Sequence, residues 1–192
     1  IRRQRQMCIR DSPKTIPLHT IQTLLSTMYR EHRGAATPFR HKKTLRDIAT
    51  VEVLFSTGIR ISELCSLKKS DVDLYDGSIL IFGKGAKERL IQIGSRDVLQ
   101  LLIQYKQTFH REMEQTGRFF VNPDASPLSD QSVRRMLKKY CALSGIDLHI
   151  TPHMFRHTFA TSLLEADVDI RYIQEMLGHS SINVTEIYTH VA

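Results

Sequence analysis

The stretch Thr151-Pro152-His153-Met154-Phe155-Arg156-His157 is the part of the sequence from which the rest can be interpreted. Its residue types predict the start of a helix. Thr151 suits the N-cap, and Pro152 suits the first helical position because its missing N–H leaves no donor unsatisfied there. Positions i, i+3 and i+4 share a helix face, so His153, Arg156 and His157 are expected together. The other side carries apolar residues at core spacing: Phe155, Phe159 and Leu163.

A second helix is expected directly downstream, at about Asp169–Leu177, with Gly178 as the residue that ends it. His179 follows this glycine at once. Tyr188 comes nine residues later, beyond a short turn. Two helix ends and a turn therefore carry polar side chains that can converge on one place.

Bulk composition indicates a chain able to form a real core. It has 192 residues, 41% of them hydrophobic, which fits one large domain or a domain with an appendage. No run of 18 apolar residues occurs, so no membrane span is expected, and the charged N-terminus does not resemble a signal peptide. The three cysteines are unpatterned and indicate free thiols in a reducing cytoplasm: Cys8, Cys65 and Cys141.

The charge balance favours a polyanionic partner. The formal net charge is +7 and the pI is about 9.5. Nucleic acid is the first candidate for such a partner and a membrane surface is the second. A soluble domain that is merely basic has the same balance, so charge alone does not decide between them.

Hydrophobic periodicity predicts a helix from near Pro17, then a basic connection over Arg33–Lys43 and a largely buried helix over Thr44–Ser56. Gly58 breaks this helix, and a short helix begins near Arg60. Lys68–Asp73 looks like a polar link. No periodicity is visible in residues 1–13, which are expected to be unstructured or foreign, with the folded domain spanning residues 14–192.

From Ser78 the period changes to that of a strand. The segments around Ile79–Phe82 and Leu90–Ile93 predict a hairpin whose turn, Gly83–Lys87, is basic. A long helix is expected over Arg96–Gln115, a short strand at Phe119–Val121, and a further helix over Ser129–Ser144. The predicted fold class is therefore mainly α with a small antiparallel sheet or hairpin (α+β).

Several side chains have both a functional and an ordinary interpretation. Arg60, three residues before Glu63, is either a surface charge or a phosphate-binding arginine that Glu63 orients. Lys84 lies between two glycines, and its side chain either is simply solvated at the turn or reaches a binding partner. The basic face of the Ser129–Ser144 helix is either simply solvated or lies along a DNA backbone. Its cationic residues are Arg134, Arg135, Lys138 and Lys139.

The histidines do not favour a metal site. The metalloprotease pattern needs Glu directly after the first histidine, and Met154 stands there instead. Arg156 on the same face would also repel a cation. The phosphate-binding loop pattern of NTPases is absent around Lys84 as well, so neither a metal nor a nucleotide cofactor is expected.

Taken together, five segments resemble the motif boxes of the tyrosine recombinase (phage integrase) family, closest to its Xer-like members. The resemblance covers about Pro17 to the C-terminus, with every box in the family's order. It implies a mainly helical catalytic domain that cleaves and rejoins duplex DNA through a covalent phosphotyrosine. The segments are Thr57–Leu64, Gly83–Arg89, His153–His157, Leu177–Ser181 and Ile187–Val191.

The resemblance also implies roles for single residues. Arg60 and Arg156 are expected to bind the reacting phosphate, since guanidinium is always charged and binds phosphate in a fork, and His179 is expected to add a donor. Tyr188 is the expected nucleophile. The expected proton donors and acceptors are His153 as base, Lys84 as acid and Lys87 as the alternative acid. Lys87 is also expected to bind DNA.

Two departures from the family pattern are expected, namely a missing N-terminal core-binding domain and a tail that ends soon after Tyr188. In full-length relatives the tail normally docks on a neighbouring protomer, so a homo- or hetero-tetramer on DNA is the expected assembly. Two other functions stay open. A DNA-binding module without catalysis would show the same basic face but would not need Tyr188 and Lys84. A metal-dependent hydrolase would use the histidines and would be inactivated by chelation.

Overall fold

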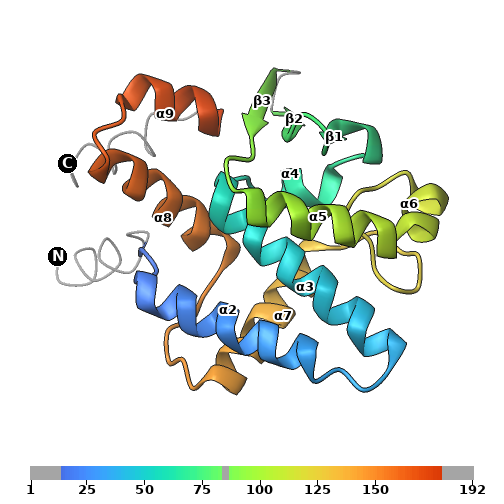
Figure 1. Cartoon of the computed structure of the whole chain (residues 1–192). Coiled ribbons are helices and arrows are strands. Elements are labelled where there is room, and N and C mark those ends of the chain that lie inside the picture. Colours follow the sequence, from blue (N-terminus) through green and yellow to red (C-terminus); the bar gives the residue numbers. More distant parts are fainter. Residues whose placement is uncertain (1–13, 84–86, 179–192) are drawn as a thin grey trace, which may run out of the picture.

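The computed structural model describes residues 14–83 and 87–178 of the chain. Two long helices, α2 (Leu18–Arg33) and α3 (Pro38–Thr57), pack side by side at its centre (Figure 1). Helix α5 (Arg96–Thr108) packs in front of α3, whereas α7 (Asp130–Ser144) lies behind it. Helix α3 is thus covered on several sides, and residues from Thr44 to Val51 along it are all buried.

A small antiparallel sheet lies at one end of the helices. Its strands are β1 (Val72–Asp73), β2 (Ser78–Phe82) and β3 (Glu88–Gln92), in that order across the sheet. Ile79 pairs with Ile91, and Ile81 pairs with Arg89. The predicted hairpin and the predicted fold class are therefore confirmed. Strand β1, part of the segment expected to be a polar link, is an addition that two residues could not signal.

The last described helices, α8 (Pro152–Glu165) and α9 (Ile170–Leu177), form a small apolar cluster of their own. Ala160, Ile173 and Leu177 are its buried members, and it is separate from the main core. Asp169 caps α9, and Gly178 ends it in the left-handed conformation with φ 64°, as the sequence predicted. Gly58, which precedes the short helix α4 (Ile61–Ser66), lies against Phe159 of α8 and Leu177 of α9.

Three predictions about helices and strands are wrong. The Arg33–Lys43 connection already contains the start of α3, where Thr37 accepts a hydrogen bond from the Arg40 amide and Pro38 occupies the first turn. The single helix over Arg96–Gln115 is interrupted at Phe109, and α6 (His110–Thr116) follows. Instead of the strand expected at Phe119–Val121, the structure has isolated bridges such as the one from Val121 to Pro127.

Two further features concern hydrophobic segments and helix capping. No helix in the described part of the chain has the length and apolar character needed to cross a bilayer. Thr151 does occupy the N-cap position of α8, but its side chain makes no capping hydrogen bond. Pro152 occupies the first turn, as expected, and it is buried there.

Candidate active site

Two arginines that are far apart in the sequence converge on the end of helix α9. Arg156 donates one hydrogen bond from Nη2 to the Leu177 carbonyl (2.6 Å) and one from Nη1 to the Gly58 carbonyl (2.8 Å). Arg60 donates from Nη1 to the same Leu177 oxygen (3.3 Å). The last carbonyls of a helix have no intrahelical partner and carry partial negative charge, so they attract cationic donors. The carbonyl of Leu177 thus holds both guanidinium groups in one place.

The two arginines differ in exposure. Arg156 is buried, because only 3% of the residue is exposed. The side chain of Arg60 is 34% exposed. Arg156 therefore also ties α8 to the ends of α3 and α9, whereas Arg60 remains accessible to solvent.

Glu63 lies beside Arg60, as the sequence suggested. Its Oε1 accepts a hydrogen bond from the Arg60 backbone N–H (3.1 Å), and its Oε2 lies 3.7 Å from Arg60 Nη1. Burial opposes ionisation of this carboxyl, but hydrogen bonds and charge from Arg89, followed by those from Arg60, lower the pKa of Glu63 overall. Glu63 is therefore a buried carboxylate that orients Arg60.

Arg89 also belongs to this cluster, although its residue type and position in the sequence predicted no role for it. Its Nη1 and Nη2 bind the two carboxylate oxygens of Glu63 at 2.6 and 2.8 Å, and its Nε donates to the Met176 carbonyl (2.9 Å). The signal was present in the strand alternation, since Arg89 occupies the same inward register as the buried Ile91. A charged residue at an inward position needs a partner, and Glu63 is that partner.

The two histidines of α8 lie in different environments. His153 is exposed, whereas His157 is 3% exposed, so the face they were expected to share is partly buried. Desolvation lowers the pKa of His153, and the charges of Arg156, Arg60 and Arg134 lower it further. His153 is therefore held as a neutral imidazole beside cations, a state in which it can accept a proton.

A cleft between β3 and α9 adjoins these arginines. Arg60, Arg89 and Lys87 line it together with Arg171 of α9. Gly83 and Gly178 also border the cleft, and at each of them the described part of the chain stops. The remaining expected site residues lie outside the described residues: Lys84, His179 and Tyr188.

The cationic residues of α7 lie on its exposed side. Val133, Leu137 and Tyr140 face the core, and the DNA-binding residues predicted on this helix are all exposed: Arg134, Arg135, Lys138 and Lys139. Arg134 is also one of the charges that lower the pKa of His153. Among residues 14–83 and 87–178, no group of three or more His, Cys, Asp or Glu side chains is arranged to hold a metal ion.

Comparison with known proteins matches this arrangement to one family. The profile of the phage integrase family matches residues 15–192. A tyrosine recombinase of Agathobacter rectalis is 66% identical over 180 residues, which cover 94% of this chain and 59% of that protein. The tyrosine recombinase XerC of Bacillus pumilus is 42% identical over 153 residues, which cover 77% of this chain and 50% of that protein.

Solved structures agree with the sequence comparison. The crystal structure of XerA recombinase is similar with a TM-score of 0.76 and 32% identity, covering 94% of this chain and 59% of that one. The XerH site-specific recombinase bound to its difH substrate, in a pre-cleavage complex, is similar with a TM-score of 0.78 and 26% identity, covering 93% and 50%. This chain therefore spans between half and three-fifths of the length of these relatives.

Proposed function

The chain belongs to the phage integrase family, and from that premise we propose that it is the catalytic domain of a tyrosine-type site-specific recombinase. Its substrate is duplex DNA, which it cleaves and rejoins through a 3′-phosphotyrosine intermediate. The observation that carries the proposal is the convergence of Arg60 and Arg156 on the Leu177 carbonyl, two residues before His179. Two fixed guanidinium groups at one point are suited to an anion that gains charge during a reaction.

Transesterification at a phosphodiester passes through a five-coordinate phosphorus with added negative charge on its non-bridging oxygens. Arg60 and Arg156 stabilise that charge, and His179 adds a third donor. Removing one preorganised donor of this kind typically costs about 100- to 1000-fold in rate. Glu63 and Arg89 do not touch the phosphate in this proposal, but they fix the orientation of Arg60.

The proton steps follow from the local electrostatics. Tyr188 attacks phosphorus, and because a phenol has a reference pKa of about 10 it needs a base, which is His153 with its lowered pKa. The DNA 5′ oxygen leaves with a proton from Lys84, or from Lys87 as the alternative. The new tyrosine–phosphate ester replaces the broken ester, so a 5′-hydroxyl strand end can attack it in turn. Rejoining therefore needs neither ATP nor a metal ion.

The partner in this proposal is double-stranded DNA, and the complete protein works as a homo- or hetero-tetramer on it, in the cytoplasm. Support for the DNA partner comes from the exposed cations of α7 and from the net charge of +7. A chelator in excess is expected to leave cleavage unchanged. Loss of cleavage on chelation, with recovery on adding zinc or magnesium, would favour a metal-dependent hydrolase instead.

The decisive experiment is covalent trapping on a duplex nicked close to the cleavage point. The short fragment carrying the 5′ hydroxyl diffuses away, so the protein remains attached to the 3′ phosphate and appears on a denaturing gel. Peptide mapping should place the DNA on Tyr188, and Tyr188→Phe should bind DNA without forming an adduct. An adduct that persists in this variant, or maps to Tyr140 or Tyr172, contradicts the assignment.

A further inference from the structure

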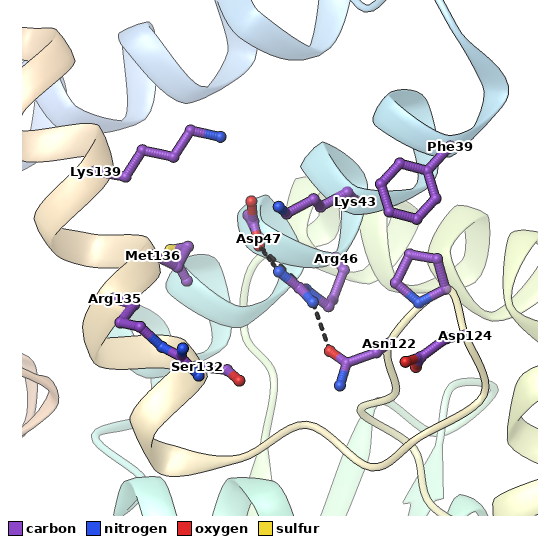
Figure 2. Close-up of a pocket in the computed structure, with 11 residues that line it drawn as sticks. Phe39, Lys43, Arg46, Asp47, Asn122, Asp124, Ser132, Arg135, Met136 and Lys139 are labelled. Carbon is purple, nitrogen blue, oxygen red and sulfur yellow. Dashed lines mark hydrogen bonds and ion pairs between the residues drawn. The ribbon is translucent and has the colours of Figure 1, made fainter.

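A second cluster of cationic side chains lies away from the arginine pair, around a cavity of about 420 Å³ between α3, α7 and the loop after Val121 (Figure 2). Lys43 and Arg46 reach it from α3, and Arg135 and Lys139 reach it from α7. The four side chains thus come from two helices far apart in the sequence. They surround one space, as the close-up shows.

Arg46 forms a rigid floor for this cavity. The residue is 7% exposed, and its Nε and Nη2 both donate to Asp47 Oδ1, at 3.1 and 2.6 Å. Its Nη1 donates to Asn122 Oδ1 at 2.5 Å, and Asp47 Oδ2 accepts a hydrogen bond from the Tyr140 hydroxyl at 2.9 Å. The charge of Asp47 is therefore already compensated within the protein.

The other three cations have no such compensation. None of Lys43, Arg135 and Lys139 forms an ion pair with a carboxylate in the part of the chain that the structure describes. The second acidic residue at the cavity, Asp124, accepts hydrogen bonds from Ser126. Four cationic side chains thus face two acidic ones, which leaves an excess of positive charge that a bound anion would neutralise.

The position of the cavity relates it to the arginine pair. Helix α7 carries Arg134 close enough to lower the pKa of His153, and it carries Arg135 and Lys139 to the cavity.

We infer that this cavity binds one phosphodiester group of the same duplex, at a position other than the reacting phosphate. The inference rests on the proposed function and adds a contact that α7 alone would not provide, because Lys43 belongs to α3. The compact, singly charged phosphodiester suits ammonium and guanidinium groups that converge on one space. An acidic segment of a protein partner is the competing occupant, and the experiment separates the two.

The test is the salt dependence of DNA binding by the full 192-residue chain and by Lys43→Gln. Each phosphate contact contributes about 0.9 to the slope of log K against log salt concentration. The slope for the variant should be smaller by about that amount. Between about 50 and 200 mM salt, the factor by which its affinity falls should therefore be about three times smaller than for the original chain. Lys106→Gln is the matched control, since Lys106 lies on α5, in front of α3.

A second variant, Ser132→Glu, adds a carboxylate to the residues that line the cavity. Ser129 caps α7 through the Ser132 amide, so glutamate there would complete a capping box and should not destabilise the helix. The Ser132→Glu variant should bind DNA more weakly, and its melting temperature should be unchanged or higher. Slopes for Lys43→Gln equal to those of the original chain and of Lys106→Gln would overturn this inference while the proposed function stands. Salt-independent binding by the original chain would overturn both.

Discussion

Arg89 binds both carboxylate oxygens of Glu63 and, through its third guanidinium nitrogen, the carbonyl of Met176. One side chain thereby joins strand β3, helix α4 and the end of helix α9. Glu63 in turn holds the backbone N–H of Arg60. The position of Arg60 thus depends on Arg89, a residue of the hairpin, although none of the hydrogen bonds described above joins the two arginines.

Arg89→Ala is expected to destabilise the fold by about 3–5 kcal/mol, because it leaves the Glu63 carboxylate buried without its main partner. Denaturant unfolding measures this loss. Arg134→Ala is the control, since its ion pair with Asp130 is exposed and should contribute no more than about 0.5 kcal/mol.

Positioning by Arg89, as distinct from general stability, is tested in Arg89→Lys and Glu63→Gln under conditions where both remain folded. Cleavage of the nicked duplex should slow in each, and the double variant should be no slower than the worse single one, since both changes break the same pair. Effects on the rate that simply multiply would mean that the two residues act independently.

Arg156→Ala is expected to lower the free energy of unfolding by about 3 kcal/mol, because two carbonyl oxygens lose a charged donor inside the protein. Arg60→Ala should cost no more than about 1 kcal/mol, since that side chain is partly exposed and Leu177 keeps its bond to Arg156. Equal stability of the two variants in urea would contradict this difference.

Gly178→Ala should be more harmful than Gly145→Ala, although both glycines follow a helix and have nearly the same φ, 64° and 67°. A Cβ atom at Gly178 would lie 2.8 Å from Arg89 Nη1, whereas nothing lies within 4 Å of one at Gly145. Gly145→Ala should therefore lose only the left-handed backbone preference, about 1 kcal/mol. The additional loss at Gly178, seen in melting temperature, reports displacement of Arg89.

The pH dependence of cleavage should depend on His153. Its pKa lies below the usual value of 6.5, so the imidazole is neutral at pH 7 and the rate should fall only as the pH drops through that lowered value. Arg134→Gln removes one positive charge that acts on His153, so its acid limb should move to higher pH. Arg135→Gln is the matched control and should leave the limb in place, with rates measured at saturating protein.

Periodicity predicted most of the elements, and it failed where chemistry other than periodicity decides structure. The start of α3 was missed because the basic run Arg40–Lys43 shows no apolar repeat, although Thr37 and Pro38 form the same start signal as Thr151 and Pro152. The interruption at Phe109 lies within one continuous apolar pattern and has no sequence marker.

Residue types and their order along the chain predicted which residues belong to the site, but not how each of them is packed. The sequence brought Arg60, Glu63 and Arg156 into one site, but nothing local indicated that Arg156 is buried, because its partners are the carbonyls of Gly58 and Leu177. Carbonyl partners carry no sequence signal, since every residue has one. The burial of Arg156 therefore became visible only in the tertiary structure.

The separate apolar cluster of α8 and α9 has a consequence for hydrogen exchange. Ile173 and Leu177 bury their side chains in that cluster and not in the main core, while arginine–carbonyl bonds hold the end of α9. Segments with few core contacts open independently of the whole molecule. The amide protons of α9 should thus exchange with deuterium through a local opening, long before those of α3, and the arginines would lose their shared carbonyl each time that helix detaches.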